Sequence, residues 1–434
     1  MFVLRLLNLA SLRSAPTSWL LGAILVGSGG QAIANVTDEN GRWDLLLRNY
    51  FLNNDLRDNS GTGGPSYQQE WAQGFIGNLR SGFTEGSVGL GIDVHGFVGI
   101  KLDGGRGRAG TGLLPVDSRG RSHGYASAGG ALKLRAGNHL LRYGEMTVET
   151  PVFDTGDKRL QPEYATGVML DSTLSPSLLL QAGRFTRFKN QNGSSSHDDF
   201  SGVGASTQGA AMTLAGVRLL DSQDISAALY AAQLEDTWRQ GYLNLKVQRG
   251  HWTLDTNLYR THDQGAARAG AIDTLAYSLL TRYQLGAQKF TVAYQRVNGD
   301  TPFDFVGGDS IYLANSVKYA DFNGAQERSW QARYDLDFAA FGITGLNLMA
   351  RYIRGHGIDS SRAPADGAYA SNRTASGGRH WERDIDLRYT VQHGSAKGLR
   401  MSLAHVSHRG NNSQNLPDID RLYITLEYPL QGLF

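Results

Sequence analysis

The sequence predicts an all-β protein, a transmembrane antiparallel β-barrel of about eighteen strands with constriction loops folded inward. Three observations support this fold class. Short segments alternate between apolar and polar residues, as strands with one buried face do. Very short connections between these segments alternate with long ones, which is typical of outer-membrane barrels. The N-terminus resembles an export signal, and the composition, with 55 glycines, 10% aromatic residues and no cysteine, suits a strand-rich chain without disulfides.

The first element is an N-terminal leader, residues 1–34, that we expect to be cleaved as a signal peptide. Arg5 and Arg13 give a positive segment ahead of the apolar part, 19–26, and residues 32–34 are Ala-Ile-Ala, a small-residue cleavage site. A buried N-terminal helix is the alternative, but the apolar stretch is short for one. Cleavage leaves a single domain, 35–434, and removes two of the 42 basic residues, so that they balance the 40 acidic ones. A neutral chain argues against nucleic-acid binding.

Eighteen alternating segments follow the leader. In 381–393, for example, Ile385 and Leu387 share one face, whereas Asp386 and Arg388 share the other. The segments begin near Trp43, Glu70, Gly86, Ala126, His139, Gly167, Ser177, Gly209, Asp224, Arg239, Trp252, Asp273, Gln288, Ser329, Gly345, Trp381, Gly398 and Arg421. An even number of strands suits a closed barrel. Alternation alone also fits a soluble sandwich or propeller, with the apolar face inside.

The connections and the chain end favour the membrane barrel. We expect short turns at 136–138, 175–176, 221–223, 248–250, 285–287 and 395–396. We expect longer loops at 101–125, 151–166, 189–207, 298–328 and 356–380. This is the pattern of an outer-membrane barrel with periplasmic turns and external loops. The chain also stops at Phe434 after an alternating strand, which resembles the C-terminal signal read by the barrel-insertion machinery.

A barrel in lipid turns its apolar faces outward, so its polar faces line a bore too wide for side chains to fill. By this parity seven basic residues point inside: Lys246, Arg282, Arg333, Arg351, Arg388, Arg400 and Arg421. Fixed cations between low-dielectric walls concentrate anions, and guanidinium groups bind carboxylates through two parallel hydrogen bonds. The alternative is that these arginines pair with lumenal Asp335, Asp386 or Glu427 and only stabilise the wall.

Two loops are predicted to narrow the bore. The loop 151–166 carries Lys158 and Arg159 beside several carboxylates. The loop 298–328 is too long and too apolar for a loose external loop, and folding back into the barrel would cover its aromatic side chains. Together these loops are expected to form an eyelet whose mixed charges bind both ends of a zwitterion.

The sequence offers no recognisable catalytic or metal-binding motif. It has no G-x-x-x-x-G-K-[ST], H-E-x-x-H or G-x-S-x-G. His405 and His408 are three residues apart on a predicted strand, so they lie on opposite faces and make a poor metal-ligand pair. We therefore expect no cofactor, no metal and no enzymatic activity.

Six stretches carry a specific resemblance: 43–53 (WDLLLRNYFLN), 74–104, 141–167, 293–324, 329–346 and 421–430. They resemble the OprD family, substrate-specific outer-membrane channels of Gram-negative bacteria, and the similarity spans essentially the whole chain after the leader. The resemblance implies a monomeric eighteen-stranded barrel that admits small carboxylate-bearing solutes. In such a channel a "basic ladder" of arginines and lysines guides the carboxylate to an eyelet, where the inward loops add an electronegative pocket.

The resemblance also assigns roles to residues. It implies that Arg159 is the basic residue of the constriction loop. With the inward parity, the expected basic path comprises Lys158, Arg159, Arg351, Arg388, Arg400 and Arg421. The expected acidic pocket comprises Asp309, Ser310, Ser316 and Asp321. Ser402 and Ala404 stand where the family's basic-amino-acid channels tend to have arginines, so both amino acids and aromatic or other organic acids remain open as cargo.

The sequence thus predicts an outer-membrane channel for facilitated, passive diffusion of small carboxylates. Its other expected partners are outer-membrane lipids, lipopolysaccharide and the insertion machinery. One alternative is a general diffusion porin of low selectivity, which keeps the barrel without the ladder. The other is a barrel-anchored outer-membrane enzyme, which needs a nucleophile and base at a loop rim that no motif identifies.

Overall fold

The computed structural model describes residues 40–57, 66–202, 204–222, 224–373, 376–411 and 416–434. The expected signal peptide, 1–34, lies outside the described residues. No helix in the described part of the chain is long and apolar enough to cross a membrane.

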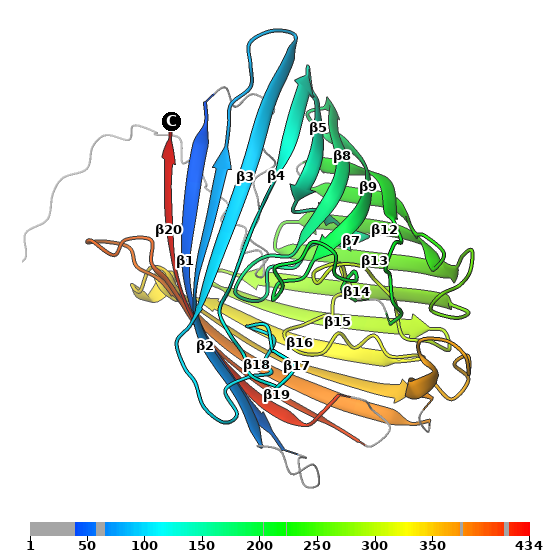
Figure 1. Cartoon of the computed structure of the whole chain (residues 1–434). Coiled ribbons are helices and arrows are strands. Elements are labelled where there is room, and N and C mark those ends of the chain that lie inside the picture. The colour runs from blue at the N-terminus through cyan, green and yellow to red at the C-terminus, as the bar shows by residue number, and fades with distance from the viewer. Residues whose placement is uncertain (1–39, 58–65, 203, 223, 374–375, 412–415) are drawn as a thin grey trace, which may run out of the picture.

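In the described residues eighteen antiparallel strands form one closed sheet. Figure 1 shows this sheet curved into a barrel. They are β1 (Arg42–Leu56), β2 (Tyr67–Arg80), β3 (Val88–Lys101), β4 (Tyr125–Ala136), β5 (His139–Met146), β8 (Tyr164–Ser175), β9 (Leu178–Lys189), β10 (Met212–Ser222), β11 (Ile225–Leu234), β12 (Trp238–Arg249), β13 (Trp252–Asp263), β14 (Asp273–Leu285), β15 (Gln288–Asn298), β16 (Arg328–Asp337), β17 (Leu346–Ile358), β18 (Gly378–Thr390), β19 (Arg400–Gly410) and β20 (Ile419–Leu433). The first and last strands pair along their whole length, from Arg42 opposite Leu433 to Leu56 opposite Ile419. This pairing closes the barrel, and the predicted fold class is confirmed.

The two ends of the barrel differ as the sequence predicts. At one end the strands are joined by short turns, such as residues 137–138 between β4 and β5 and 286–287 between β14 and β15. At the other end the connections are mostly long, and 299–327 between β15 and β16 matches the predicted boundaries. The other inward loop runs over 147–163 and not 151–166, because β5 ends at Met146 and β8 begins three residues earlier than expected. This loop contains a short two-stranded ribbon.

That ribbon consists of β6 (Glu149–Thr150) and β7 (Phe153–Asp154). Two short 3-10 helices, η1 (Phe338–Phe341) and η2 (Ala370–Asn372), lie in other connections. In η1 the side chain of Asp337 caps the first turn by accepting a hydrogen bond from the Ala339 N–H at 2.9 Å.

Side-chain parity distinguishes the two faces of the wall. On β18, Ile385 and Leu387 are 43% and 39% exposed, whereas Asp384 and Asp386 are 0% and 1% exposed. The same alternation on the other strands gives an apolar outer surface and a polar inner one. Since a closed sheet leaves no unpaired edge, this arrangement suits a hydrocarbon surrounding.

Candidate solute path

The seven basic residues predicted to point inward all lie on the inner face of their strands. On β19, Arg400 and Ser402 alternate with Met401 and Leu403, whose side chains are 38% and 47% exposed on the outer face. On β12, Lys246 follows the outward-facing Leu245 in the same way. The described wall therefore presents its cations to the bore.

Three of these arginines are paired with wall carboxylates. Arg351 Nε lies 2.5 Å from Asp384 Oδ2, and both side chains are buried. Arg388 Nη2 lies 2.7 Å from Asp386 Oδ2, an oxygen that also pairs with Lys318 Nζ at 3.2 Å. A third pair joins Arg333 and Asp335 at 2.6 Å. These three contacts fit the alternative that such arginines pair with lumenal carboxylates and stabilise the barrel wall.

Arg421 and Arg400 differ from these pairs. Arg421 Nε donates to Asn54 Oδ1 at 2.6 Å, and its guanidinium lies 4.6 Å from the centre of the Tyr319 ring. Neither Arg421 nor Arg400 has a carboxylate partner within the part of the chain that the structure describes. No ion pair among the described residues therefore cancels either charge, although Arg400 is directly opposite Glu427, whose carboxylate pairs with Arg48.

Strand register arranges three arginines down one side of the bore. Arg421 on β20 is opposite Val406 on β19, and Arg388 on β18 is opposite Ser402. Arg400 lies two residues further along β19, toward the short-turn end. With about 3.3 Å per strand residue, these levels are separated by roughly 13 Å and 7 Å. The spacing gives a column of cations roughly 20 Å long from the loop end toward the turn end.

The inward loop 147–163 is held against the inner wall by Arg48. This buried arginine on β1 donates from Nη1 to Asp157 Oδ1 at 2.6 Å and to the Arg159 carbonyl oxygen at 2.8 Å. Its Nε donates to Glu427 Oε1 at 2.7 Å. The fork of one guanidinium therefore joins the loop to both strands at the barrel seam.

The loop presents Lys158 and Arg159 side by side. Arg159 is half-buried, donates from Nη1 to the Lys158 carbonyl oxygen at 3.0 Å, and has no carboxylate partner in the described chain. Lys158 is more exposed, and its Nζ lies 2.8 Å from Asp309 Oδ1 on the loop 299–327. Burial opposes the charged ammonium, but the carboxylates of Asp309 and Asp321 outweigh it and raise the pKa of Lys158.

Hydrogen bonds join the two inward loops. Glu163 accepts from the N–H groups of Gly156 and Gly308 at 2.7 Å each, so its carboxylate bridges the loops. Gly307 approaches the Asp154 carbonyl so closely, at a φ of 89°, that a side chain would collide there. Ser310 is 1% exposed and accepts from the Asp154 N–H at 2.6 Å. Ser310 therefore joins the loops and does not face the bore.

The other predicted acidic residues lie nearer the open space. Ser316 Oγ donates to Asp321 Oδ1 at 2.7 Å, and the Asp321 carbonyl accepts from Gln295 Nε2 on β15 at 3.0 Å. Burial has the largest effect and raises the pKa of Asp321 above its usual value, although the nearby Lys158 ammonium opposes this shift. Lys158, Asp309 and Asp321 thus form one mixed-charge group between the loops.

Further wall contacts position the loop 299–327. Glu382 on β18 accepts from the backbone N–H groups of Tyr319 and Ala320 at 3.1 and 2.8 Å. Gln240 on β12 donates to the Asp304 carbonyl at 3.0 Å. Because inner-face side chains of well-separated strands make these contacts, the loop lies inside the wall, as Figure 1 also shows.

Comparison with known proteins identifies the family. The sequence model described as "outer membrane porin, OprD family" matches residues 38–432. The chain belongs to the OprD family. Porin D of Pseudomonas aeruginosa is 41% identical over 419 residues, covering 93% of this chain and 94% of that protein. The Porin-like protein GalP of Pseudomonas putida is 34% identical over 412 residues, covering 93% and 95%.

Solved structures agree with this assignment. The crystal structure of Pseudomonas aeruginosa OpdK with vanillate superposes with a TM-score of 0.80 at 37% identity, covering 91% of this chain and 99% of that one. The chain is thus an OprD-family porin, a channel of the Gram-negative outer membrane, and its relatives are porins and not enzymes.

Two features of this OprD-family channel were missed in the sequence. Arg48 lies on the inner face of β1 with Tyr50 and Asn54, so parity applied to that segment would have found it. The pair formed by His380 and His408, whose ring nitrogens are 2.8 Å apart, joins neighbouring strands and needs their register to be known. No cluster of three or more metal-ligating side chains occurs among the described residues.

Proposed function

We propose that this OprD-family porin carries small carboxylate-bearing solutes by facilitated, passive diffusion along Arg421, Arg388 and Arg400. The supporting observation is that Arg421, Arg400 and the loop residue Arg159 have no carboxylate partner in the described chain. An unneutralised cation in a narrow bore attracts anions, and Arg388, whose side chain is 40% exposed, can donate to an entering carboxylate while it stays paired with Asp386. Several weak sites in sequence permit both entry and exit.

The eyelet is proposed to recognise the rest of the solute. Lys158 and Arg159 supply positive charge on one loop, and Asp309 and Asp321 supply negative charge on the other. Ser316 holds Asp321 in place, while Arg351, paired with Asp384, stabilises the wall beside the path. A solute with a carboxylate and a polar or cationic group matches this arrangement. The relative OpdK was crystallised with vanillate, an aromatic carboxylate, which supports this substrate class.

The proposal includes the route to the membrane and the assembly there. Residues 1–34 act as a cleaved signal peptide, and 35–434 form one monomeric barrel domain that the inward loops 147–163 and 299–327 constrict. Phe434 presents the terminal strand to the insertion machinery. The apolar outer surface contacts outer-membrane lipids and lipopolysaccharide. Transport by this route requires no cofactor and no metal.

Solute flux through reconstituted protein tests the selective path. In liposome swelling, the Arg421→Gln/Arg400→Gln variant should admit small carboxylates about three- to tenfold more slowly, with uptake of neutral sugars of similar size unchanged. The matched control is Arg333→Gln/Asp335→Asn, which removes an ion pair without changing the charge of the bore. It should alter carboxylate uptake by less than about twofold. Equal uptake of carboxylates and sugars by the unmodified protein would refute selectivity.

A general diffusion porin of low selectivity is the second candidate. The ion pair Arg333–Asp335 favours it, because paired charges attract anions weakly. This candidate predicts that swelling rates depend on solute size alone and that the Arg421→Gln/Arg400→Gln variant behaves like its control.

A further inference from the structure

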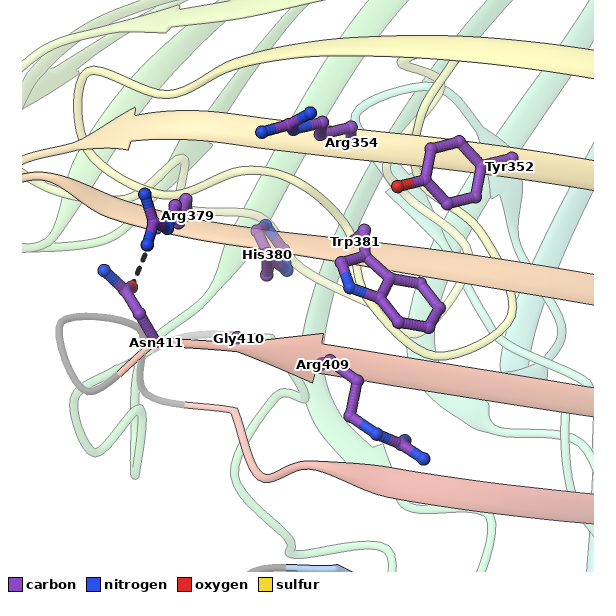
Figure 2. Close-up of a pocket in the computed structure, with 8 residues that line it drawn as sticks. All are labelled: Tyr352, Arg354, Arg379, His380, Trp381, Arg409, Gly410 and Asn411. Carbon is purple, nitrogen blue, oxygen red and sulfur yellow. Dashed lines mark hydrogen bonds between the residues drawn. The ribbon is translucent and has the colours of Figure 1, made fainter.

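A basic pocket lies on the outside of the barrel, near the long-loop end of β17, β18 and β19. Its volume is about 410 Å³. We call it the outer arginine pocket, and its lining side chains include Tyr352, Arg354, Arg379, Trp381, Arg409 and Asn411, drawn in Figure 2. It is separate from the solute path, because these strand residues have the opposite parity from the inward-facing Arg351 and Asp384.

Strand register places the cations around one aromatic ring. Trp381 on β18 is directly opposite Arg354 on β17 and Arg409 on β19. Arg379 lies two residues nearer the loop end of β18, and its backbone N–H donates to Asn411 Oδ1 at 3.0 Å. Adjacent strands are about 4.8 Å apart, so the three guanidinium groups extend from a small area of the wall.

Two of these arginines keep their charge unneutralised. Arg409 Nη2 is paired with Asp420 Oδ2 at 2.8 Å. Arg354 and Arg379 have no carboxylate partner among the residues that the structure describes. A surface that concentrates like charges in this way lowers its energy by binding an anion.

The pocket lies directly above the apolar surface. Tyr352 and Trp381 stack with ring centres 5.9 Å apart, and such aromatic residues mark the membrane interface of barrels. Further from the loops, β18 presents Ile385 and Leu387 on the same outer face. Because long loops are external in these barrels, the arginines lie at the level of the outer-leaflet headgroups.

We propose that the outer arginine pocket binds a phosphate group carried by an acylated lipid of the outer leaflet. The guanidinium forks of Arg354 and Arg379 match the oxygens of a phosphate, and the apolar surface below receives the acyl chains. A free phosphate ion lacks the second contact and binds more weakly. This binding does not depend on which solute the channel carries.

Binding of defined lipids to the full barrel in detergent tests the proposal. The probes are bisphosphorylated lipid A, the same lipid with its phosphates removed, and inorganic phosphate, each followed by native mass spectrometry. The phosphorylated lipid should bind at least tenfold more tightly than the dephosphorylated lipid. The Arg354→Ala/Arg379→Ala variant should lose this preference. If inorganic phosphate at equal concentration displaces the lipid, the site is one for free anions and the lipid proposal fails.

A matched variant controls for nonspecific loss of surface charge. Arg260 also lies on the outer face near the loop end, on β13, and is paired with Asp273. Arg260→Ala should bind the phosphorylated lipid as the unmodified barrel does. Arg354→Lys/Arg379→Lys keeps both charges without the forks and should retain intermediate binding, which provides a second test if the alanine variant folds poorly. Equal binding by all four proteins would overturn the proposal.

Discussion

At the scale of single residues, the partner of each lumenal arginine determines what that arginine does. Arg351 and Asp384 are both buried, and Arg351 Nε lies 2.5 Å from Asp384 Oδ2, so the two charges form an ion pair inside the wall. Arg421 instead contacts the Asn54 amide and the Tyr319 ring, which leave its charge intact. The same residue type therefore serves both the wall and the proposed solute path.

Removing Arg351 is expected to destabilise the barrel. Arg351→Ala leaves Asp384 buried beside Glu382 without a counter-ion, and breaking a buried pair in this way costs about 3–5 kcal/mol. The temperature at which the folded band is lost in electrophoresis should fall. Arg351→Ala/Asp384→Ala should recover much of the loss, because no unpaired charge remains. A double variant as unstable as the single one would contradict this account of the pair.

Asp304 is expected to make stability depend on pH. Burial raises its pKa from 3.8 to about 7, despite hydrogen bonds from Tyr369 and the Phe305 N–H. The unfolded chain ionises first as pH rises, so the folded state loses stability from about pH 4 to about pH 7. At about 1.4 kcal/mol per pKa unit, the full penalty above pH 7 is at most about 4 kcal/mol.

Asp304→Asn should remove this pH dependence. The unmodified barrel should lose its folded electrophoretic band at a lower temperature at pH 8 than at pH 5, and the variant should narrow that difference. Asp366→Asn alters an exposed carboxyl in the loop that also holds Tyr369 and serves as the control. Identical pH profiles for the unmodified barrel and Asp304→Asn would show that the Asp304 carboxyl does not ionise differently on folding.

At the scale of elements, strands could be predicted from the sequence and loop contacts could not. Each strand repeats its apolar face over 8 to 15 residues, so its existence and parity are local properties. Arg48 instead contacts Asp157 and Glu427, which are 109 and 379 positions away in the chain. The family resemblance placed Ser310 at the acidic pocket, but its burial between the loops depends on how they pack.

Phe153 is expected to fix the inward loop 147–163. Its ring is fully buried and contacts Phe185 edge-on at 5.1 Å between ring centres, with Phe200 at 5.7 Å. Phe153→Ala removes about 3–5 kcal/mol of packing from the loop while leaving the strand pairing intact. Single-channel recordings should then show larger current fluctuations, and protease should cut the loop faster.

The control for this loop variant is Phe341→Ala. Phe341 is 66% exposed in η1 at the turn end of the barrel, so its loss removes little packing. Its current trace and protease pattern should match those of the unmodified barrel. Quiet, uncut channels in Phe153→Ala would show that hydrogen bonds alone hold the loop.

At the scale of the whole molecule, the two-residue alternation of side chains along each strand determines both the stability of the barrel and its function. The outer face of each strand must suit lipid, and the inner face of the same strand must suit water and solute. A shift of one residue along a strand exchanges these surroundings. On β19, Ser402 faces the bore and its neighbour Leu403 faces the lipid at almost the same height in the wall. Arg388 is opposite Ser402.

The same substitution at these two positions should have opposite outcomes. Leu403 is 47% exposed on the outer face, and an arginine on the lipid-facing surface of a barrel costs up to about 2–4 kcal/mol, depending on its depth. Leu403→Arg should therefore reduce the folded fraction in lipid vesicles. Ser402→Arg places the charge in the bore beside Asp386, should fold normally, and should speed carboxylate entry by adding a cation next to Arg388. Normal folding of Leu403→Arg together with failure of Ser402→Arg would mean that the two faces had been assigned the wrong way round.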